Sequence, residues 1–178
     1  MPLRLARLEH ALTRPIEDLA AELLRLAEAK QVSISTAESC TAGAAATTLA
    51  AAPGAGLRFH GGIVVYTKRS KTEWLGVPAD LLAERSAVCR DVAVAMADGL
   101  LARSPAGVAI AITGVAGPEP DEDGNPVGLM HVAVRLRMGG GGHRELRLPN
   151  GHRDELRHCA VRAALDLAIE VIGSSRDG

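Results

Sequence analysis

Aromatic side chains are scarce in this 178-residue chain, and neither sign of charge is in clear excess. The aromatic residues of the Phe, Tyr and Trp types are Phe59, Tyr66 and Trp74, and the formal net charge at pH 7 is -1. Proteins that bind nucleic acid usually combine a basic surface with rings on which bases stack. The composition therefore argues against a nucleic-acid partner.

Long apolar runs are also missing. No window of 18 uninterrupted apolar residues occurs, so no membrane-spanning helix and no membrane partner are predicted. Residues 1–14 are basic, but they contain neither the apolar core nor the small-residue cleavage site of a secretory signal. We therefore expect a cytoplasmic protein.

Cysteines are few and lie far apart. Cys40, Cys89 and Cys159 form no CxxC pair, so we interpret them as reduced, with Cys89 and Cys159 as small core residues. The six histidines show no spacing that is typical of a metal site. The sequence therefore predicts neither a bound metal nor another cofactor.

What the chain does contain is typical of one globular domain. Apolar residues make up 47% and charged residues 23%, and 178 residues are enough to bury a full core. Pro15 suits the first position of a helix that runs to about Lys30 with its apolar residues on one face. We predict a single domain over residues 15–178, preceded by a basic lead-in of residues 1–14.

Segments with helix and strand patterns alternate along this domain. The predicted helices are 15–30, 44–52, 68–75, a short one after Pro78, 87–103 and 151–172. The predicted strands are 32–36, 59–67, 107–112, 127–138 and 143–148. Because the alternation comes first and a hairpin comes late, the pattern predicts an α/β fold, a three-layer α/β/α sandwich on a mixed sheet of about five strands.

Two turns of unusual composition follow predicted strands, at residues 36–43 and 113–118. The first precedes an alanine-rich helix, whose unpaired amides and dipole would favour an anion or a developing oxyanion. The same residue types also form an ordinary helix cap, and the local sequence favours the two interpretations equally. Ligands of α/β sheets gather at the carboxyl ends of strands, which favours a functional site at both turns.

Five blocks of the sequence occur together in an order that is known from one family: Thr36–Thr41, Gly62–Thr67 with Lys71 and Leu75–Val77, Thr113–Pro118, Pro126–Gly128 and Gly151–Arg153. They resemble the C-terminal domain family of the competence/damage-inducible protein CinA, which includes stand-alone nicotinamide-nucleotide amidohydrolases. The resemblance covers nearly the whole chain beyond Pro15. It implies a serine/lysine hydrolase without metal that converts nicotinamide mononucleotide (NMN) to nicotinic acid mononucleotide and ammonia.

The resemblance also implies a role for each matched residue. Ser39 would be the nucleophile, Lys71 the base and Tyr66 a proton relay, and the backbone amides of residues 40–43 would donate to an oxyanion. The mononucleotide partner would be held by substrate-binding residues, which are Glu38, Cys40, Thr41, Gly43, Thr113, Gly114, Gly117 and Arg153.

A lysine base needs an unusual environment. Its pKa must fall from ~10.4 toward ~7, at a cost of roughly 4 kcal/mol, and this requires burial or a neighbouring cation. Lys68 and Arg69 could supply such a cation. The alternative for Lys71 is an ordinary solvated lysine, and the alternative for Tyr66 is a packed ring with its hydroxyl in water.

Departures from the family pattern leave a second function open. The family usually has Pro-Gly-Ser-Ser where this chain has Pro53-Gly54-Ala55-Gly56, and its second serine is the other candidate nucleophile. If that serine attacks, Gly56 leaves a non-hydrolytic nucleotide-binding module. A further departure is the acidic segment Glu119–Asp123, which would repel a phosphate unless it points away or serves subunit contacts. We also expect a homo-oligomer.

Overall fold

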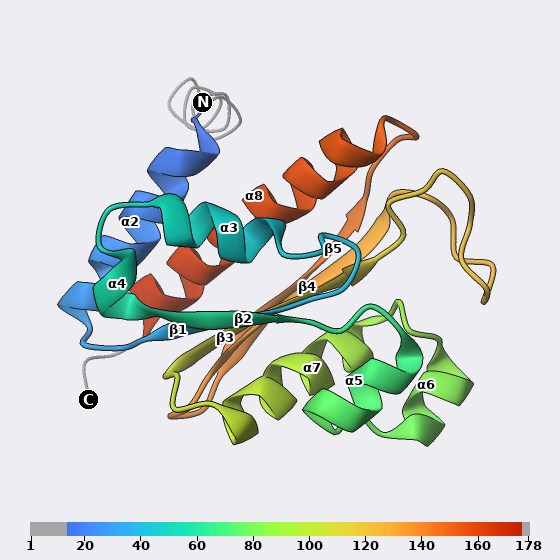
Figure 1. Cartoon of the computed structure of the whole chain (residues 1–178), viewed down its shortest axis with the longest axis horizontal. Coiled ribbons are helices and arrows are strands. Elements are labelled where there is room, and N and C mark those ends of the chain that lie inside the picture. The colour runs from blue at the N-terminus through green and yellow to red at the C-terminus, as the bar shows by residue number, and fades with distance from the viewer. Residues whose placement is uncertain (1–13, 176–178) are drawn as a thin grey trace.

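The computed structural model describes residues 14–175, which form one mixed sheet between two layers of helices (Figure 1). The strand order is β2-β1-β3-β4-β5. The first three strands are parallel and the last two form an antiparallel hairpin, so the predicted α/β/α sandwich is confirmed. The strands are β1 (Ile34–Glu38), β2 (Phe59–Val64), β3 (Val108–Gly114), β4 (Leu129–Leu136) and β5 (Gly141–Arg147).

The helices divide between the two faces of the sheet, as Figure 1 shows. One face carries α2 (Ile16–Ala29), α3 (Ala44–Ala51), α4 (Ala55–Arg58) and α8 (Arg153–Ser174). The other carries α5 (Lys68–Leu75), α6 (Ala79–Arg85) and α7 (Arg90–Arg103). No helix among residues 14–175 is long and apolar enough to cross a membrane.

The central strand β3 joins the two cores. Ile110 and Ile112 point into the core beneath α2, α3 and α8, while Ala109 and Ala111 point into the core beneath α5 and α7. Successive strand side chains face opposite sides, so a strand that is covered on both faces reads as a continuous apolar run. The run at residues 107–112 is therefore correctly interpreted as a central strand.

Some predicted boundaries were wrong. Strand β1 begins two residues later than predicted and includes Thr36–Glu38, which the sequence had suggested for the turn. Strand β2 ends at Val64, because Thr67 caps α5 by accepting a hydrogen bond from the amide of Ser70 at 3.0 Å. Cys159 is exposed and is not the predicted core residue. The basic lead-in lies outside the described residues except for Arg14.

The pairing of the three parallel strands places several loops at one edge of the sheet. Glu38 pairs with Ile112 on one side and with Val64 on the other. The amide of Ser39 donates to the carbonyl of Ile112 at 2.9 Å, and the amide of Val65 donates to the carbonyl of Glu38 at 2.8 Å. The residues that follow β1, β2 and β3 are therefore neighbours.

Two histidines on the hairpin form a partly buried pair. His131 is 5% exposed, its Nδ1 lies 3.0 Å from Nε2 of His143, and the two rings are stacked. Burial is the largest cause that lowers the pKa of both rings. The charge of His143 lowers the pKa of His131 further, and the charge of Arg90 lowers the pKa of His143 further. A hydrogen bond between two imidazoles also requires at least one neutral ring.

This pair should make the fold less stable in mild acid. Below the ordinary histidine pKa of 6.5, the unfolded chain binds protons that the folded pair resists, so stability falls as the pH is lowered from 7 to 5. Replacing His143 by phenylalanine should reduce this fall in melting temperature, and replacing the exposed His60 by glutamine should not. An unchanged pH dependence in His143→Phe would contradict this assignment.

Candidate active site

A cavity of about 370 Å³ opens where the carboxyl ends of the parallel strands meet. Its walls come from the turn after β1, the start of α5, residues 113–117, the acidic loop that follows and the first residue of α8. The predicted site residues that line it are Ser39, Cys40, Tyr66, Lys71, Thr113, Gly114, Gly117 and Arg153. Residues far apart in the sequence thus meet at the predicted edge of the sheet.

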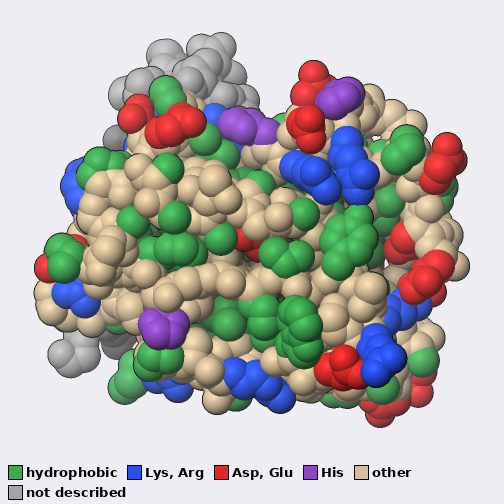
Figure 2. All heavy atoms as spheres, viewed as in Figure 1, with side chains coloured by type: hydrophobic (Ala, Val, Ile, Leu, Met, Phe, Trp, Pro, Cys, Tyr) green, Lys and Arg blue, Asp and Glu red, His purple; other side chains and the backbone are tan. Residues whose placement is uncertain are grey.

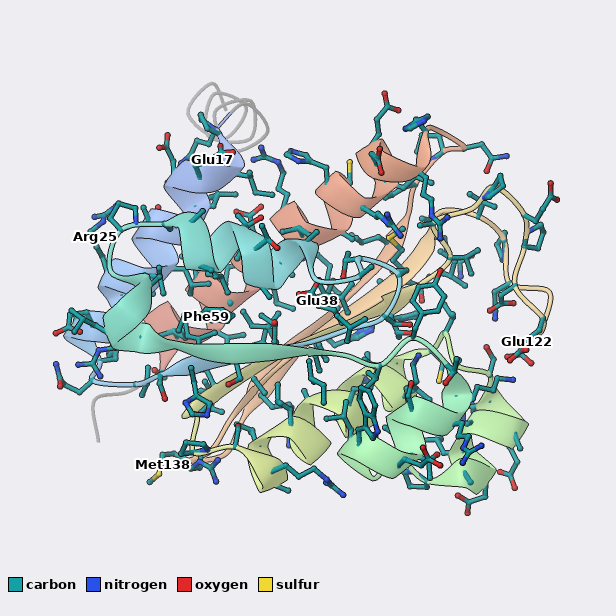
Figure 3. All side chains as sticks on the ribbon, in the orientation of Figure 1. Glu17, Arg25, Glu38, Phe59, Glu122 and Met138 are labelled. Carbon is teal, nitrogen blue, oxygen red and sulfur yellow. The ribbon has the colours of Figure 1, made fainter. Side chains whose placement is uncertain are left out.

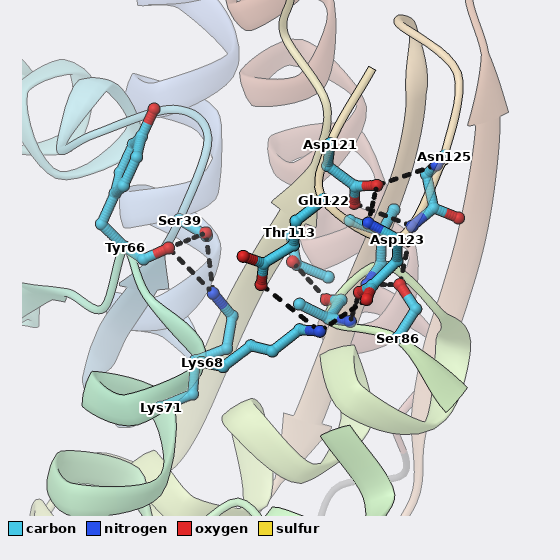
Figure 4. Close-up of polar contacts among 12 residues, drawn as sticks. Ser39, Tyr66, Lys68, Lys71, Ser86, Thr113, Asp121, Glu122, Asp123 and Asn125 are labelled. Carbon is cyan, nitrogen blue, oxygen red and sulfur yellow. Dashed lines mark hydrogen bonds and ion pairs between the residues drawn. The ribbon is translucent and has the colours of Figure 1, made fainter. Parts of the chain in front are cut away.

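Ser39 and Lys71 both line this cavity, and Figure 4 shows the contact between them. The Nζ atom of Lys71 lies 2.9 Å from Oγ of Ser39. The same nitrogen donates to the carbonyl of Val65 at 2.9 Å and lies 3.4 Å from the carbonyl of Tyr66. Lys71 is 1% exposed and Ser39 6% exposed. A hydroxyl and a buried amine are therefore held in contact in the wall of the cavity.

Burial lowers the pKa of Lys71 from 10.5 to about 8, and Cys40 and, to a smaller extent, Glu122 act in the opposite direction. The sequence suggested that a neighbouring cation could also lower this pKa. Lys68 does not do so, because it binds the carboxylates of Glu122 and Asp123. A neutral lysine has two N–H groups and one lone pair. Charged Lys71 donates to Oγ of Ser39. In the neutral form its two N–H groups can go to the carbonyls of Val65 and Tyr66, and its lone pair is then able to accept the hydroxyl proton of Ser39.

Tyr66 contributes differently from the prediction. Its hydroxyl accepts a hydrogen bond from Nη2 of Arg153 at 2.9 Å, and Figure 4 shows the ring directed away from Lys71. The backbone carbonyl of Tyr66, and not its hydroxyl, lies near Nζ of Lys71 and Oγ of Ser39, at 3.4 Å from each. The hydroxyl is thus not placed to relay a proton. Arg153 presents its guanidinium to the cavity beside the tyrosine ring.

Glu38 lies behind the cavity and does not line it. Its buried carboxylate accepts hydrogen bonds from the amides of Gly43, Ala45 and Ala46, at 3.1, 3.0 and 2.8 Å, and Figure 3 shows it beside the start of α3. The predicted anion site at this helix terminus is therefore occupied by the carboxylate of the chain itself. Gly43 has no free amide for substrate, and its φ is +97°.

Thr41 also lies outside the cavity. It is 2% exposed and contributes to a separate hollow between α2, α3 and α8. Of the four residues that were predicted to supply oxyanion donors, Cys40 is the one that lines the cavity. Burial raises the pKa of the Cys40 thiol to about 12, so this side chain stays protonated and is a poor nucleophile.

The turn after β3 forms the opposite wall. The hydroxyl of Thr113 donates to the carbonyl of Ala87 at 2.8 Å, so it braces the turn. Gly114 is required by packing, because a Cβ there would lie 2.5 Å from Cγ of Met130. The backbone amides of Ala116 and Gly117 donate no hydrogen bond to other residues in the range 14–175. They are further candidates for oxyanion donors that the sequence did not single out.

The acidic segment lies along the rim of the cavity. Asp121 organises the loop, since its Oδ1 accepts from the amides of Asp123 and Asn125 at 3.0 and 2.8 Å. Nζ of Lys68 lies 2.7 Å from Asp123 and 3.3 Å from Glu122. The sequence singled out both the acidic segment and Lys68, but it gave no signal that the two pair with each other.

Gly56 is remote from these groups. It belongs to α4, which precedes β2, and β2 starts at Phe59 opposite Ile34 at the other end of β1 from Ser39 (Figure 1). Gly56 does not line the cavity, and a Cβ added there would meet no atom of residues 14–175 within 4 Å. A hydroxyl at this position would therefore not reach Lys71 of the same chain.

Replacing Glu38 by glutamine should destabilise the fold although the shape of the side chain is kept. The amide group of glutamine would face backbone N–H donors, and buried hydrogen bonds to a charged group would be lost. We expect unfolding to become easier by about 2–4 kcal/mol. Urea denaturation measures this, with the exposed Glu17→Gln variant as the matched control. A loss below about 0.5 kcal/mol would contradict the role of Glu38.

Comparison with known proteins agrees with this architecture. Residues 16–172 match the model of the CinA C-terminal domain. A CinA-like protein of Gemmatimonas aurantiaca is 40% identical over 151 residues, which cover 84% of this chain and 35% of that protein. A CinA-like protein of Mycolicibacterium vanbaalenii is 42% identical over 152 residues, which cover 85% and 35%. The chain thus spans about a third of the length of these relatives.

Solved structures give the same result. The competence/damage inducible protein CihA of Agrobacterium tumefaciens superposes with a TM-score of 0.85 at 38% identity, over 89% of this chain and 96% of that one. The competence damage-inducible protein A of Klebsiella pneumoniae superposes with a TM-score of 0.87 at 33% identity, over 92% and 100%. The chain therefore belongs to the CinA C-terminal domain family.

Proposed function

We propose that this protein is an amidohydrolase that removes the carboxamide nitrogen of NMN, with Ser39 as nucleophile and Lys71 as base. The observation that carries the proposal is the 2.9 Å contact between the buried Nζ of Lys71 and Oγ of Ser39 inside a cavity. A serine hydroxyl is a weak nucleophile until an adjacent base takes its proton. A lysine with a pKa of about 8 is able to act as that base near neutral pH.

The reaction divides into two balanced steps. In the first, Oγ of Ser39 attacks the carboxamide carbon while Nζ of Lys71 takes the hydroxyl proton. The C–N bond then breaks, Lys71 returns the proton to the departing nitrogen, and ammonia leaves an ester on Ser39. In the second step water attacks this ester with Lys71 again as base, which releases the carboxylate and restores the serine.

The remaining cavity groups suit the rest of this substrate. The guanidinium of Arg153, at the start of α8, is suited to a phosphate, because both the fork geometry and the helix terminus favour an anion. The amides near Cys40, Ala116 and Gly117 are candidates to stabilise the oxyanion. A cavity of about 370 Å³ is within the usual range for small-molecule sites.

A non-hydrolytic nucleotide-binding module is the second candidate. It was suggested by the missing serine at Gly56, but that position lies outside the cavity, whereas Ser39 and Lys71 are both present in it. The geometry therefore favours hydrolysis over binding alone. The expected homo-oligomer and cytoplasmic location stay predictions.

The test is release of ammonia from NMN by the purified protein, with Lys71→Ala as the background control. We expect ammonia and nicotinic acid mononucleotide to appear in equal amounts. Saturable NMN binding with no release above the control would reject the amidohydrolase and favour the binding module.

A further inference from the structure

The cavity carries opposite charges on its two sides. Arg153 lies on the side formed by α8, and the carboxylates of residues 119–123, two of which pair with Lys68, lie on the other. Figure 2 shows acidic side chains along the right-hand margin of the molecule, where Figure 1 places the loop between β3 and β4. A ligand that fills the cavity therefore meets both signs of charge.

The carboxylates of this loop are not equivalent. Asp121 is taken up by the loop itself, and Asp123 contacts Lys68 at 2.7 Å and the amide of Ala87 at 3.4 Å. Within the described part of the chain, the polar contact of the Glu122 side chain is the longer one to Nζ of Lys68, at 3.3 Å, and this side chain is 73% exposed. Glu122 therefore makes the weaker of the two ion pairs with Lys68, and its charge remains available to a ligand.

The charge of Glu122 is also felt at the candidate reacting pair. It raises the pKa of Lys71, against the larger effect of burial. Glu122, Ser39 and Lys71 all line the cavity, and Figure 4 shows Glu122 on the acidic loop, apart from the pair of Ser39 and Lys71. A group bound between Ser39 and the acidic loop would thus lie within the field of Glu122.

We propose that Glu122 determines substrate specificity by attracting the positive charge of the ring that bears the carboxamide. This inference rests on the proposed function and adds to it a specificity residue, which favours a ligand with a cationic ring over a ligand of the same size with a neutral ring. The field of a carboxylate a few ångströms away favours a cation and gives no comparable advantage to a neutral ring. Arg153 would hold the phosphate at the far side of the same ligand.

NMN and its dihydro form test this directly. They share the carboxamide, ribose and phosphate and differ in ring charge. The oxidised ring also makes its carboxamide more electrophilic, so the ratio of kcat/KM in the wild-type protein does not isolate recognition. The change of that ratio on Glu122→Gln isolates recognition. The intrinsic reactivity of each substrate is the same with both proteins, and a change in the pKa of Lys71 affects both substrates alike.

We expect Glu122→Gln to reduce the preference for NMN by about 5- to 10-fold, which corresponds to an interaction of about 1 kcal/mol between charges in a wet site. Glu73→Gln is the matched control, because Glu73 lies on the outer face of α5 and pairs with Arg69. It should leave the ratio unchanged. A ratio that changes by less than twofold in Glu122→Gln would overturn the inference.

Binding separates failure of this inference from failure of the proposed function. In Ser39→Ala, which cannot turn over by the proposed route, calorimetry should show tighter binding of NMN than of the dihydro form. That difference should shrink when Glu122→Gln is added. Equal affinities would overturn the role of Glu122 while hydrolysis stands. Absence of hydrolysis by the wild-type protein, with the affinity difference intact, would remove the amidohydrolase and keep the selection of a cation.

Discussion

Replacing Lys71 by methionine should abolish amide hydrolysis and at the same time stabilise the fold. The base is lost, which removes a contribution of about 10³-fold or more to the rate. The stabilisation follows from burial, since Lys71 is 1% exposed and its pKa falls from 10.5 to about 8. Holding a charged amine in that place costs about 3 kcal/mol, and methionine of similar length avoids the cost. Methionine also removes the donor to the carbonyls of Val65 and Tyr66, at about 1 kcal/mol each, so the expected net gain is about 1 kcal/mol.

The gain in stability should depend on pH in a defined way. The folded pKa of Lys71 lies below the unfolded one, so the unfolded chain binds more protons between pH 8 and pH 10.5. The stability of the wild-type protein therefore rises through that window, and the full cost is present below pH 8. The advantage of Lys71→Met should be largest near pH 7 and should shrink above pH 8.

Ammonia release and urea denaturation at pH 7 and pH 10 measure these two effects. The matched control is Arg69→Met on the same helix, because Arg69 is exposed and pairs with Glu73. It should leave both activity and stability nearly unchanged. Retention of most activity by Lys71→Met, or a loss of stability at pH 7, would contradict the assignment of Lys71 as a buried base.

Replacing Ser39 by alanine should lower turnover of NMN by at least about 10³-fold. Gly56→Ser should leave turnover unchanged, because position 56 lies outside the cavity at the opposite end of β1. The pair separates the two serine positions that the family offers as nucleophiles. Steady-state kinetics measures both variants, and circular dichroism shows whether each is folded. Greatly increased hydrolysis in Gly56→Ser, together with full activity in Ser39→Ala, would reverse the assignment.

The layers of the fold were predictable because they depend on local pattern. The apolar run of β3 and the alternation of helices with strands are properties of neighbouring residues, and the structure confirms both. The sequence also predicted Ser39 in the turn that follows the first strand, and in the structure Ser39 follows β1 directly. The end of β1 was misplaced, because Thr36 and Glu38 are polar residues that are buried inside a strand.

The chemistry of the site was predictable only in part. Nothing in the local sequence distinguishes Lys71 from a solvated helix lysine, because its burial depends on packing against residues that follow β1 and β2. The hydrogen bond from Arg153 to the hydroxyl of Tyr66 joins residues 87 positions apart. The three amides that bind Glu38 belong to the next helix. Such contacts arise from tertiary structure and have no local signature.

The most direct test of the account is to trap the ester on Ser39. Rapid acid quenching during turnover of NMN, followed by proteolysis and mass spectrometry, should find the peptide that contains Ser39 heavier by the acyl part of the substrate. The same peptide from Ser39→Ala should carry no addition. An adduct on another residue, or full turnover by the alanine variant, would contradict the central claim that Ser39 and Lys71 act as nucleophile and base.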